Sequence, residues 1–160
     1  MAGPVALAEA LAPLRRPVEP HVVMQVNEYD VRVAKVAGEH VWHAHDDTDK
    51  FLLVLDGELT IALEEPSGGR TVVLPTGSVF VVPRGTRHRP SSPAGASILM
   101  LEPSGTLSTG DAVDLPGHVD STTGHALDRP AKRTRGRPQL ERWPGGVRAR
   151  RGSSSCLPQR

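Results

Sequence analysis

The sequence predicts an all-β protein whose strands form a sandwich or a barrel. Between His21 and Glu102, segments rich in β-branched residues are separated by turn-forming residues about every eight to twelve positions. One of these segments alternates as a half-buried strand should, with Tyr29, Val31 and Val33 interleaved with Asp30, Arg32 and Ala34. No helical pattern of useful length interrupts residues 22–102, which argues against helices that connect parallel strands.

We expect a strand at each segment of high β propensity, and these segments are residues 21–26, 29–37, 51–55, 58–63, 70–74, 79–82 and 97–102. Asp56-Gly57 separates FLLVL from ELTIAL, and Asp-Gly favours the positive φ angles of a type I′ turn. The sequence therefore predicts a hairpin at this point. Glycine and proline mark further turns at residues 67–69, 75–77 and 83–85.

The regions outside the strands have a different character. Leu7, Leu11 and Leu14 are at helical spacing and Pro13 limits their segment, so we expect a short helix within residues 1–20. Residues 21–127 are expected to form the barrel and an irregular arm. Residues 128–160 contain ten Lys and Arg but two acids, which leaves the remainder with 9 basic and 16 acidic residues. Because Arg, Gly, Pro and Ser dominate this basic tail, we expect it to be disordered.

Several classes of protein are disfavoured by what the sequence lacks. No apolar run approaches the roughly 20 residues that span a bilayer, and no signal peptide is visible. Cys156 is the one cysteine, so an internal disulfide is excluded, and we expect a cytoplasmic protein. The sequence contains no nucleophile elbow, phosphate-binding loop or Cys-x-x-Cys motif, which disfavours serine hydrolases, P-loop proteins and zinc ribbons.

Histidines suggest a metal site. His43 and His45 flank Ala44, and residues two apart on a strand face the same way, so both imidazoles can point into one cavity. Residues 77–88 contain a strand, a Pro-x-Gly turn and then His88. An adjacent antiparallel strand could bring His88 beside the first pair; the alternative is an ordinary turn followed by an exposed histidine. We expect His40 to lie on an exposed loop.

The order of these residues resembles the two sequence motifs of the cupin superfamily. Gly38, His43, His45, an acid and Gly57 follow the first motif. GSVFVVPRGTRH, residues 77–88, matches the second motif through its histidine, and Ser92 stands where that motif has an asparagine. WHAHDDTDKFLLVLDGELTI also resembles small single-domain cupins similar to mannose-6-phosphate isomerase, as does the later EPSGTLSTGD. The resemblance covers residues 22–127.

This resemblance implies a double-stranded β-helix, or jelly-roll barrel, and a homodimer. It also implies one divalent transition metal, with His43, His45 and His88 as ligands, and Fe, Mn, Ni, Zn or Cu would suit these nitrogens. A small polar molecule would then bind at the metal. The family includes dioxygenases, isomerases and decarboxylases, so the reaction class stays open. The alternative is a non-catalytic binding protein, or a degenerate cupin that lacks the metal.

Position 50 departs from the motif. Close relatives carry an acid five residues after the second histidine, where this chain has Lys50 preceded by Asp49. In one interpretation Asp49 is the fourth metal ligand. In a second, three histidines bind the metal more weakly without an acid. In the third, Lys50 takes the place of the metal as a fixed positive charge.

The basic tail contains a further motif. Arg135-Gly136-Arg137-Pro138 resembles the AT-hook core, which inserts arginines into the minor groove of A·T-rich DNA. A tail rich in Arg, Gly and Pro produces this tetrapeptide by chance, so DNA association is a minor alternative. We expect a small molecule and a second copy of the chain as partners, and neither a membrane nor a nucleic acid.

Overall fold

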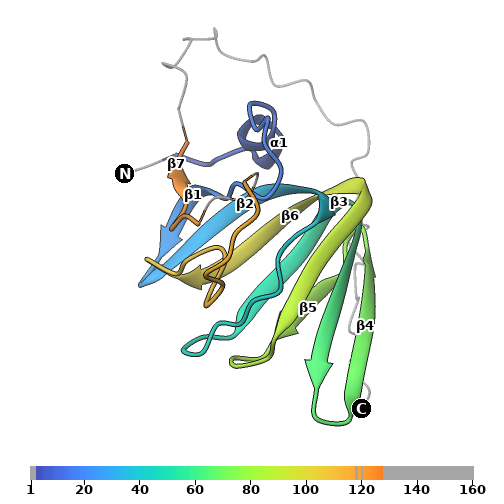
Figure 1. Cartoon of the computed structure of the whole chain (residues 1–160). Coiled ribbons are helices and arrows are strands. Elements are labelled where there is room, and N and C mark those ends of the chain that lie inside the picture. Colours follow the sequence, from blue (N-terminus) through green and yellow to red (C-terminus); the bar gives the residue numbers. More distant parts are fainter. Residues whose placement is uncertain (1–2, 118, 120, 128–160) are drawn as a thin grey trace, which may run out of the picture. The chain divides into compact units, whose positions relative to one another are not determined.

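The computed structural model describes residues 3–117, 119 and 121–127 (Figure 1). The predicted disorder of the basic tail therefore lies outside the described residues. The described part has one helix and seven strands: α1 (Leu7–Leu11), β1 (His21–Val26), β2 (Tyr29–Glu39), β3 (Lys50–Glu65), β4 (Gly68–Pro75), β5 (Val79–Val82), β6 (His88–Pro103) and β7 (His125–Ala126). The all-β prediction is confirmed. Among these residues, no helix has the length and apolar character needed to cross a membrane.

The strands form a mixed sheet in which two long strands hold the others together. The order is β4-β3-β6-β2-β1-β7, and β5 pairs with β3 beside β4. One edge of β3 pairs with β5 through residues 50–53 and with β4 through residues 58–65, while its other edge pairs with β6. Figure 1 shows β3 and β6 running side by side through the sheet. All these pairs are antiparallel, and β7 joins β1 in parallel.

The predicted hairpin at Asp56-Gly57 is wrong, because β3 continues through both residues. Its pairing with β6 shifts register between Val54 and Asp56 and again after Gly57. Gly57 has a φ of 80°, and a Cβ atom there would collide with the backbone of Gly95 on β6. The Asp-Gly pair therefore forms a bulge that bends the strand without reversing it. The two flanking segments pair with β6, β5 and β4 instead of with each other.

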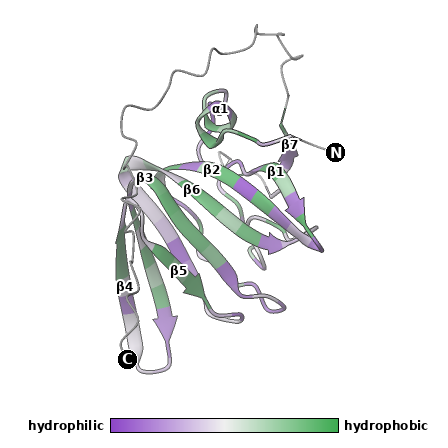
Figure 2. Ribbon diagram, turned by 180° about the vertical axis from the view of Figure 1, so that it is seen from behind, coloured by the Kyte–Doolittle hydropathy of each residue, from purple (hydrophilic) through white to green (hydrophobic). Residues whose placement is uncertain are grey.

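Aliphatic side chains fill the main core. Buried and less buried residues alternate along β3, and its buried side chains include Leu52, Val54, Leu59 and Ile61. Figure 2 shows hydrophobic segments along the strands of the sheet. The buried side chains of β3 pack with apolar residues of the neighbouring strands, namely Ala34, Val36, Leu63, Leu74, Val82, Ile98 and Met100. This core holds β3 and β6 in place; β3 begins at the site described below, and β6 ends there.

The short N-terminal helix is confirmed, and it covers the other face of β2. Ala10 and Leu14 pack in a second apolar cluster with Val23 and Val33. The expectation that β2 is only half-buried is wrong, because Asp30 and Arg32 on its opposite face are also buried. These charges are tolerated inside because the Arg32 guanidinium pairs with the Asp30 carboxylate at 3.1 Å.

Candidate metal centre

His43 and His88 lie on two backbone segments that are bonded to each other. The amide of His43 donates to the carbonyl of His88 at 3.0 Å, and the amide of His88 donates back at 2.8 Å. The amide of Gly85 in the Pro-x-Gly turn donates to the carbonyl of His45 at 2.8 Å. The turn therefore hydrogen-bonds the second motif to the first. The expected antiparallel neighbour of the histidine pair is confirmed.

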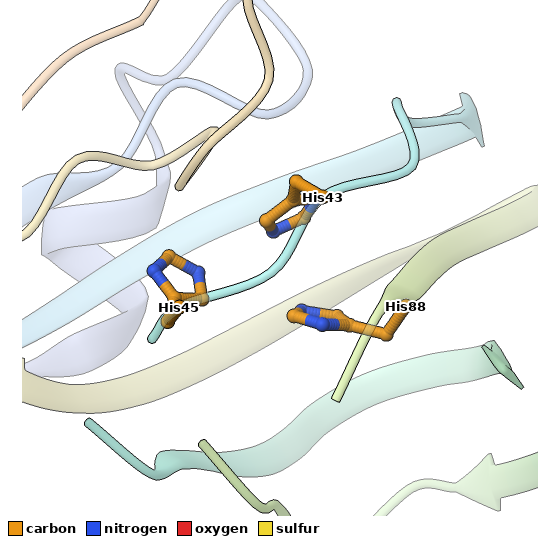
Figure 3. Close-up of side chains that lie close together, drawn as sticks. All are labelled: His43, His45 and His88. Carbon is orange, nitrogen blue, oxygen red and sulfur yellow. The ribbon is translucent and has the colours of Figure 1, made fainter. Parts of the chain in front are cut away.

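The three imidazoles converge in a buried position (Figure 3). The ring of His43 lies 4.2 Å from that of His88 and 5.1 Å from that of His45, measured between centroids. One ring nitrogen from each residue lies within 4.8 Å of the others. These nitrogens come from segments far apart in the chain, so the structure brings together all three histidines that the motif indicates.

Backbone carbonyls orient two of the rings. Nδ1 of His43 lies 2.9 Å from the carbonyl of Val41, and Nδ1 of His88 lies 3.0 Å from the carbonyl of Thr86. With the proton on Nδ1, each Nε2 carries a lone pair directed into the pocket. Both Nε2 atoms are buried and have no hydrogen-bond partner within the described residues. Buried acceptors without partners are rare, and a metal ion would satisfy them. The histidines therefore fit a metal.

Burial keeps the imidazoles neutral. It lowers the pKa of His45 to about 4, with a further contribution from the Lys50 charge. It also lowers the pKa of His88 to about 4 and holds the pKa of His43 well below its usual range. Neutral imidazole is the form that binds metals, so the histidines are ready to act as ligands near neutral pH.

Lys50 reaches into the same pocket from the start of β3. It is buried, and its Nζ lies 3.2 Å from Nε2 of His45. An ammonium group has only protons to offer, so Nε2 of His45 accepts this hydrogen bond through its lone pair. Lys50 therefore contacts the atom that His45 would present to a metal.

Glu102 is the acid of this pocket, and the sequence interpretation missed it. It lies near the end of β6 and is 1% exposed. Its Oε1 lies 3.0 Å from Nζ of Lys50 and 3.9 Å from Nε2 of His45, and its Oε2 lies 3.4 Å from Nη1 of Arg32. Burial alone would raise the pKa of Glu102, but the charge of Lys50 and its other cationic neighbours lower that pKa overall. The carboxylate is therefore ionised and held between two cations.

A signal for Glu102 was present in the sequence. Ile98, Met100 and Glu102 are two residues apart, so they face the same way on a strand. The first two belong to the main core, and this spacing directs Glu102 to the same interior.

Asp49 lies outside the histidine cluster. Its exposed carboxylate accepts hydrogen bonds from the backbone amide of Arg84 at 3.0 Å and from Nε of Arg84 at 3.2 Å. Successive residues at the start of a strand point to opposite sides, so Lys50 enters the pocket and Asp49 does not. This geometry disfavours the interpretation in which Asp49 is the fourth ligand.

A segment after β6 supports the backbone between the first two histidines. The amide of Ala44 donates to Oδ1 of Asp111 at 2.6 Å, and the amide of Asp111 donates to the carbonyl of Ala44 at 3.0 Å. Gly110 has a φ of 49°, and a Cβ atom there would collide with the carbonyl of Ala44 and lie 3.3 Å from Cδ2 of His43. Gly110 and Asp111 therefore act as a clamp on the His-x-His segment.

A cavity lies next to these side chains. Its lining includes His43, Lys50 and Glu102, and apolar residues of the main core complete it: Val36, Leu52, Leu59, Ile98 and Met100. His40 also lines it and is buried, so the expectation of an exposed loop histidine is wrong. The cavity has a volume of about 30 Å³, which is room for one or two water-sized groups beside the histidines.

Comparison with known proteins agrees with this fold. Residues 29–102 match the cupin domain family. A cupin-2 domain containing protein from Shewanella frigidimarina is 30% identical, with a TM-score of 0.58 over 62% of this chain and 93% of that one. This chain therefore belongs to the cupin superfamily.

Two other proteins are also similar to parts of this chain. An uncharacterized Bacillus subtilis protein, YdbB, is 39% identical over 70 residues, which cover 44% of this chain and 59% of that protein. Hydroquinone 1,2-dioxygenase from a Sphingomonas species, solved with 4-hydroxybenzoate bound, is 18% identical with a TM-score of 0.50, over 64% of this chain and 80% of that chain. At this identity the dioxygenase shares the fold, and its reaction is not transferred.

Proposed function

We propose that this cupin binds a divalent transition metal through the Nε2 atoms of His43, His45 and His88, and that a small polar molecule binds at that metal. The observation that carries the proposal is the pair of buried Nε2 atoms, on His43 and His88, that have no hydrogen-bond partner among the described residues. Fe, Mn, Ni, Zn and Cu all suit a site of this donor type. A bound metal with an open position would act as a Lewis acid toward an oxygen atom of the ligand or would activate dioxygen.

The protein's own residues shape the ligand site around that metal. The core side chains Leu59 and Met100 exclude water from one side of the cavity, and Lys50 presents a positive charge beside the histidines. An anionic or carbonyl oxygen of a ligand matches this lining, because the cavity of about 30 Å³ has room for a group of that size beside Lys50. An isomerase and a dioxygenase are both compatible with it, because fold does not determine reaction class.

The finer assignments rest on the sequence. Its motifs support a small single-domain cupin similar to mannose-6-phosphate isomerase. The exposed side chains of Val73, Val79 and Val81 on β4 and β5 support a homodimer, because apolar surface favours a partner. The single cysteine supports a cytoplasmic location.

A second candidate function follows from the position of Lys50. Its ammonium group already contacts Nε2 of His45, as a cation bound at this site would. In a cupin without a metal, Lys50 would be the fixed charge that binds a small anion, and the protein would sense or store that ligand without turnover.

Elemental analysis and calorimetric titration with Zn²⁺ test the proposal. We expect the wild-type protein to bind about one equivalent of metal per chain, and His43→Ala and His88→Ala to lose most of it. His125→Ala is the matched control, because His125 is an exposed histidine that pairs with Glu19. Equal metal content in all four proteins would overturn the proposal. An absence of metal in the wild type, together with anion binding that Lys50→Met abolishes, would establish the second candidate.

A further inference from the structure

Four charged side chains form a buried row that ends at the histidines. Asp30 pairs with Arg32, Arg32 with Glu102, and Glu102 with Lys50. All four are buried, and their formal charges alternate and cancel. A buried charge without a partner is strongly destabilising, so each member depends on the next one. Glu102 is the member that connects this row to the candidate metal centre.

The two oxygens of Glu102 have different neighbours. Arg32 holds Oε2 at 3.4 Å, which leaves Oε1 directed toward the pocket. Oε1 lies 3.9 Å from Nε2 of His45. Ligand atoms bound at about 2.0–2.2 Å to one tetrahedral ion lie roughly 3.3–3.6 Å apart. A shift of a few tenths of an ångström would bring these two atoms to that separation. Glu102 lies outside the group of ligand atoms that are all within 4.8 Å of one another, so its carboxylate has to move further to share one ion with all three histidines.

Lys50 holds the place between these two atoms. Its Nζ is 3.0 Å from Oε1 of Glu102 and 3.2 Å from Nε2 of His45. An ammonium group that is bound by a carboxylate and an imidazole has the same partners as a metal ion would have there. The lysine stem is long and flexible, so the ammonium can withdraw without a movement of β3. Arg32 would keep Glu102 oriented after that withdrawal.

We propose that Glu102 is the carboxylate ligand of the metal and that the Lys50 ammonium competes with the metal for Glu102 and His45. This inference rests on the proposed function, and it assigns the acid that the motif lacks at position 50 to a different strand. It also gives Lys50 a defined effect, which is to weaken metal binding. A simpler role for Glu102 is to neutralise Lys50 without touching the metal, and the two roles predict different results.

A double-mutant cycle separates the two roles. The four proteins are the wild type, Lys50→Met, Glu102→Gln and Lys50→Met/Glu102→Gln, and the probe is Zn²⁺ alone in competition with a chromophoric chelator. We expect Lys50→Met to bind Zn²⁺ at least about tenfold more tightly, because a like charge is removed from beside the ion. Adding Glu102→Gln to Lys50→Met should weaken binding about 10- to 100-fold, the size of effect that even outer partners of metal sites have.

The competing role gives the opposite outcome in the double variant. If Glu102 only neutralises Lys50, its substitution has no effect once Lys50 is gone, and the double variant binds as tightly as Lys50→Met. That result, or an unchanged affinity in Lys50→Met, would overturn the inference. Spectra of bound Co²⁺ add a second readout, in which the double variant is compared with Lys50→Met. If Glu102 is a ligand, its loss shifts the d–d bands of the cobalt ion. If Glu102 is only a nearby charge, the bands stay in place.

Controls keep folding and ligation apart. Asp49→Asn removes the neighbouring acid, whose carboxylate faces Arg84, and should leave Zn²⁺ affinity unchanged. Glu102→Gln alone leaves Lys50 buried without its anion and is strongly destabilised, so the decisive pair is Lys50→Met and the double variant. Circular dichroism before titration establishes that both are folded. If only the assignment of Glu102 is wrong, metal binding still requires the histidines. If the protein binds no metal at all, Lys50→Met binds none either, and the proposed function is wrong.

Discussion

The interior of this cupin has an apolar region and a charged region, and the same strands carry both. On β3, Lys50 lies at the pocket and Leu52 and Val54 follow in the core. On β6, Ile98 and Met100 lie in the core and Glu102 lies at the pocket. The apolar region is stabilised by each side chain that leaves water, so its members act nearly independently. The charged region is stable only as pairs between strands, because a buried charge needs its partner.

Acid should destabilise the protein through the buried histidines beside the charged region, and it should leave the apolar region unaffected. This is the largest effect that we expect. The pKa values of His45 and His88 are lowered to about 4, below the usual value of 6.5, so the unfolded chain binds protons first. Their contribution is complete above pH 6.5 and is lost as the pH falls toward 4. Since one pKa unit corresponds to about 1.4 kcal/mol, the metal-free protein should lose several kcal/mol.

Chemical denaturation of chelator-treated protein at pH 7.5, 6, 5 and 4.5 measures this loss. A His43→Gln/His45→Gln/His88→Gln variant is the control, and its free energy of unfolding should depend much less on pH over the same range. A wild-type free energy of unfolding that stays constant from pH 7.5 to 4.5 would contradict the burial of neutral imidazoles.

A cavity in the apolar region should give the next largest effect. Ile61 is fully buried on β3, and Ile61→Ala should lower the free energy of unfolding by about 2–5 kcal/mol through lost burial and an unfilled cavity. Urea denaturation measures the change. Val113→Ala, at a side chain that is 88% exposed, should change stability by less than about 1 kcal/mol. A folded Ile61→Ala protein should keep its metal stoichiometry, and a loss of metal would show that the two regions are coupled.

The clamp on the His-x-His segment should give the most local effect, at the candidate metal centre itself. Gly110→Ala places a Cβ atom against the carbonyl of Ala44, whereas Gly105→Ala meets no atom within 4 Å. Both glycines have positive φ, so both variants carry the same kind of backbone strain of about 1 kcal/mol. We expect Gly110→Ala to be the less stable and to bind Zn²⁺ more weakly. Equal Zn²⁺ affinity in the two variants would show that the clamp does not support metal binding.

Most strands were predictable, because alternation and turn residues act over a few positions. The two wrong predictions about the sheet have a common cause. Asp56-Gly57 has the composition of a hairpin turn, but its flanking segments find other partners, and the pair becomes a bulge on β3. Asp30 and Arg32 have the composition of a solvent face, but Glu102 and Arg32 meet across 70 residues of sequence and form a buried pair. Local composition cannot report such partners.

The sequence by itself determined the β class, the short helix and the shared face of His43 and His45, because residue spacing sets which side chains point the same way. The resemblance to the cupin motifs added the expectation that His88 joins them. Only the tertiary structure decided which acid faces the histidines. Asp49 and Glu102 are both acids next to apolar strands, and strand pairing sends one to Arg84 at the surface and the other to Lys50 inside. The electrostatic cost of burial makes that choice, and it depends on charges that are distant in sequence and adjacent in space.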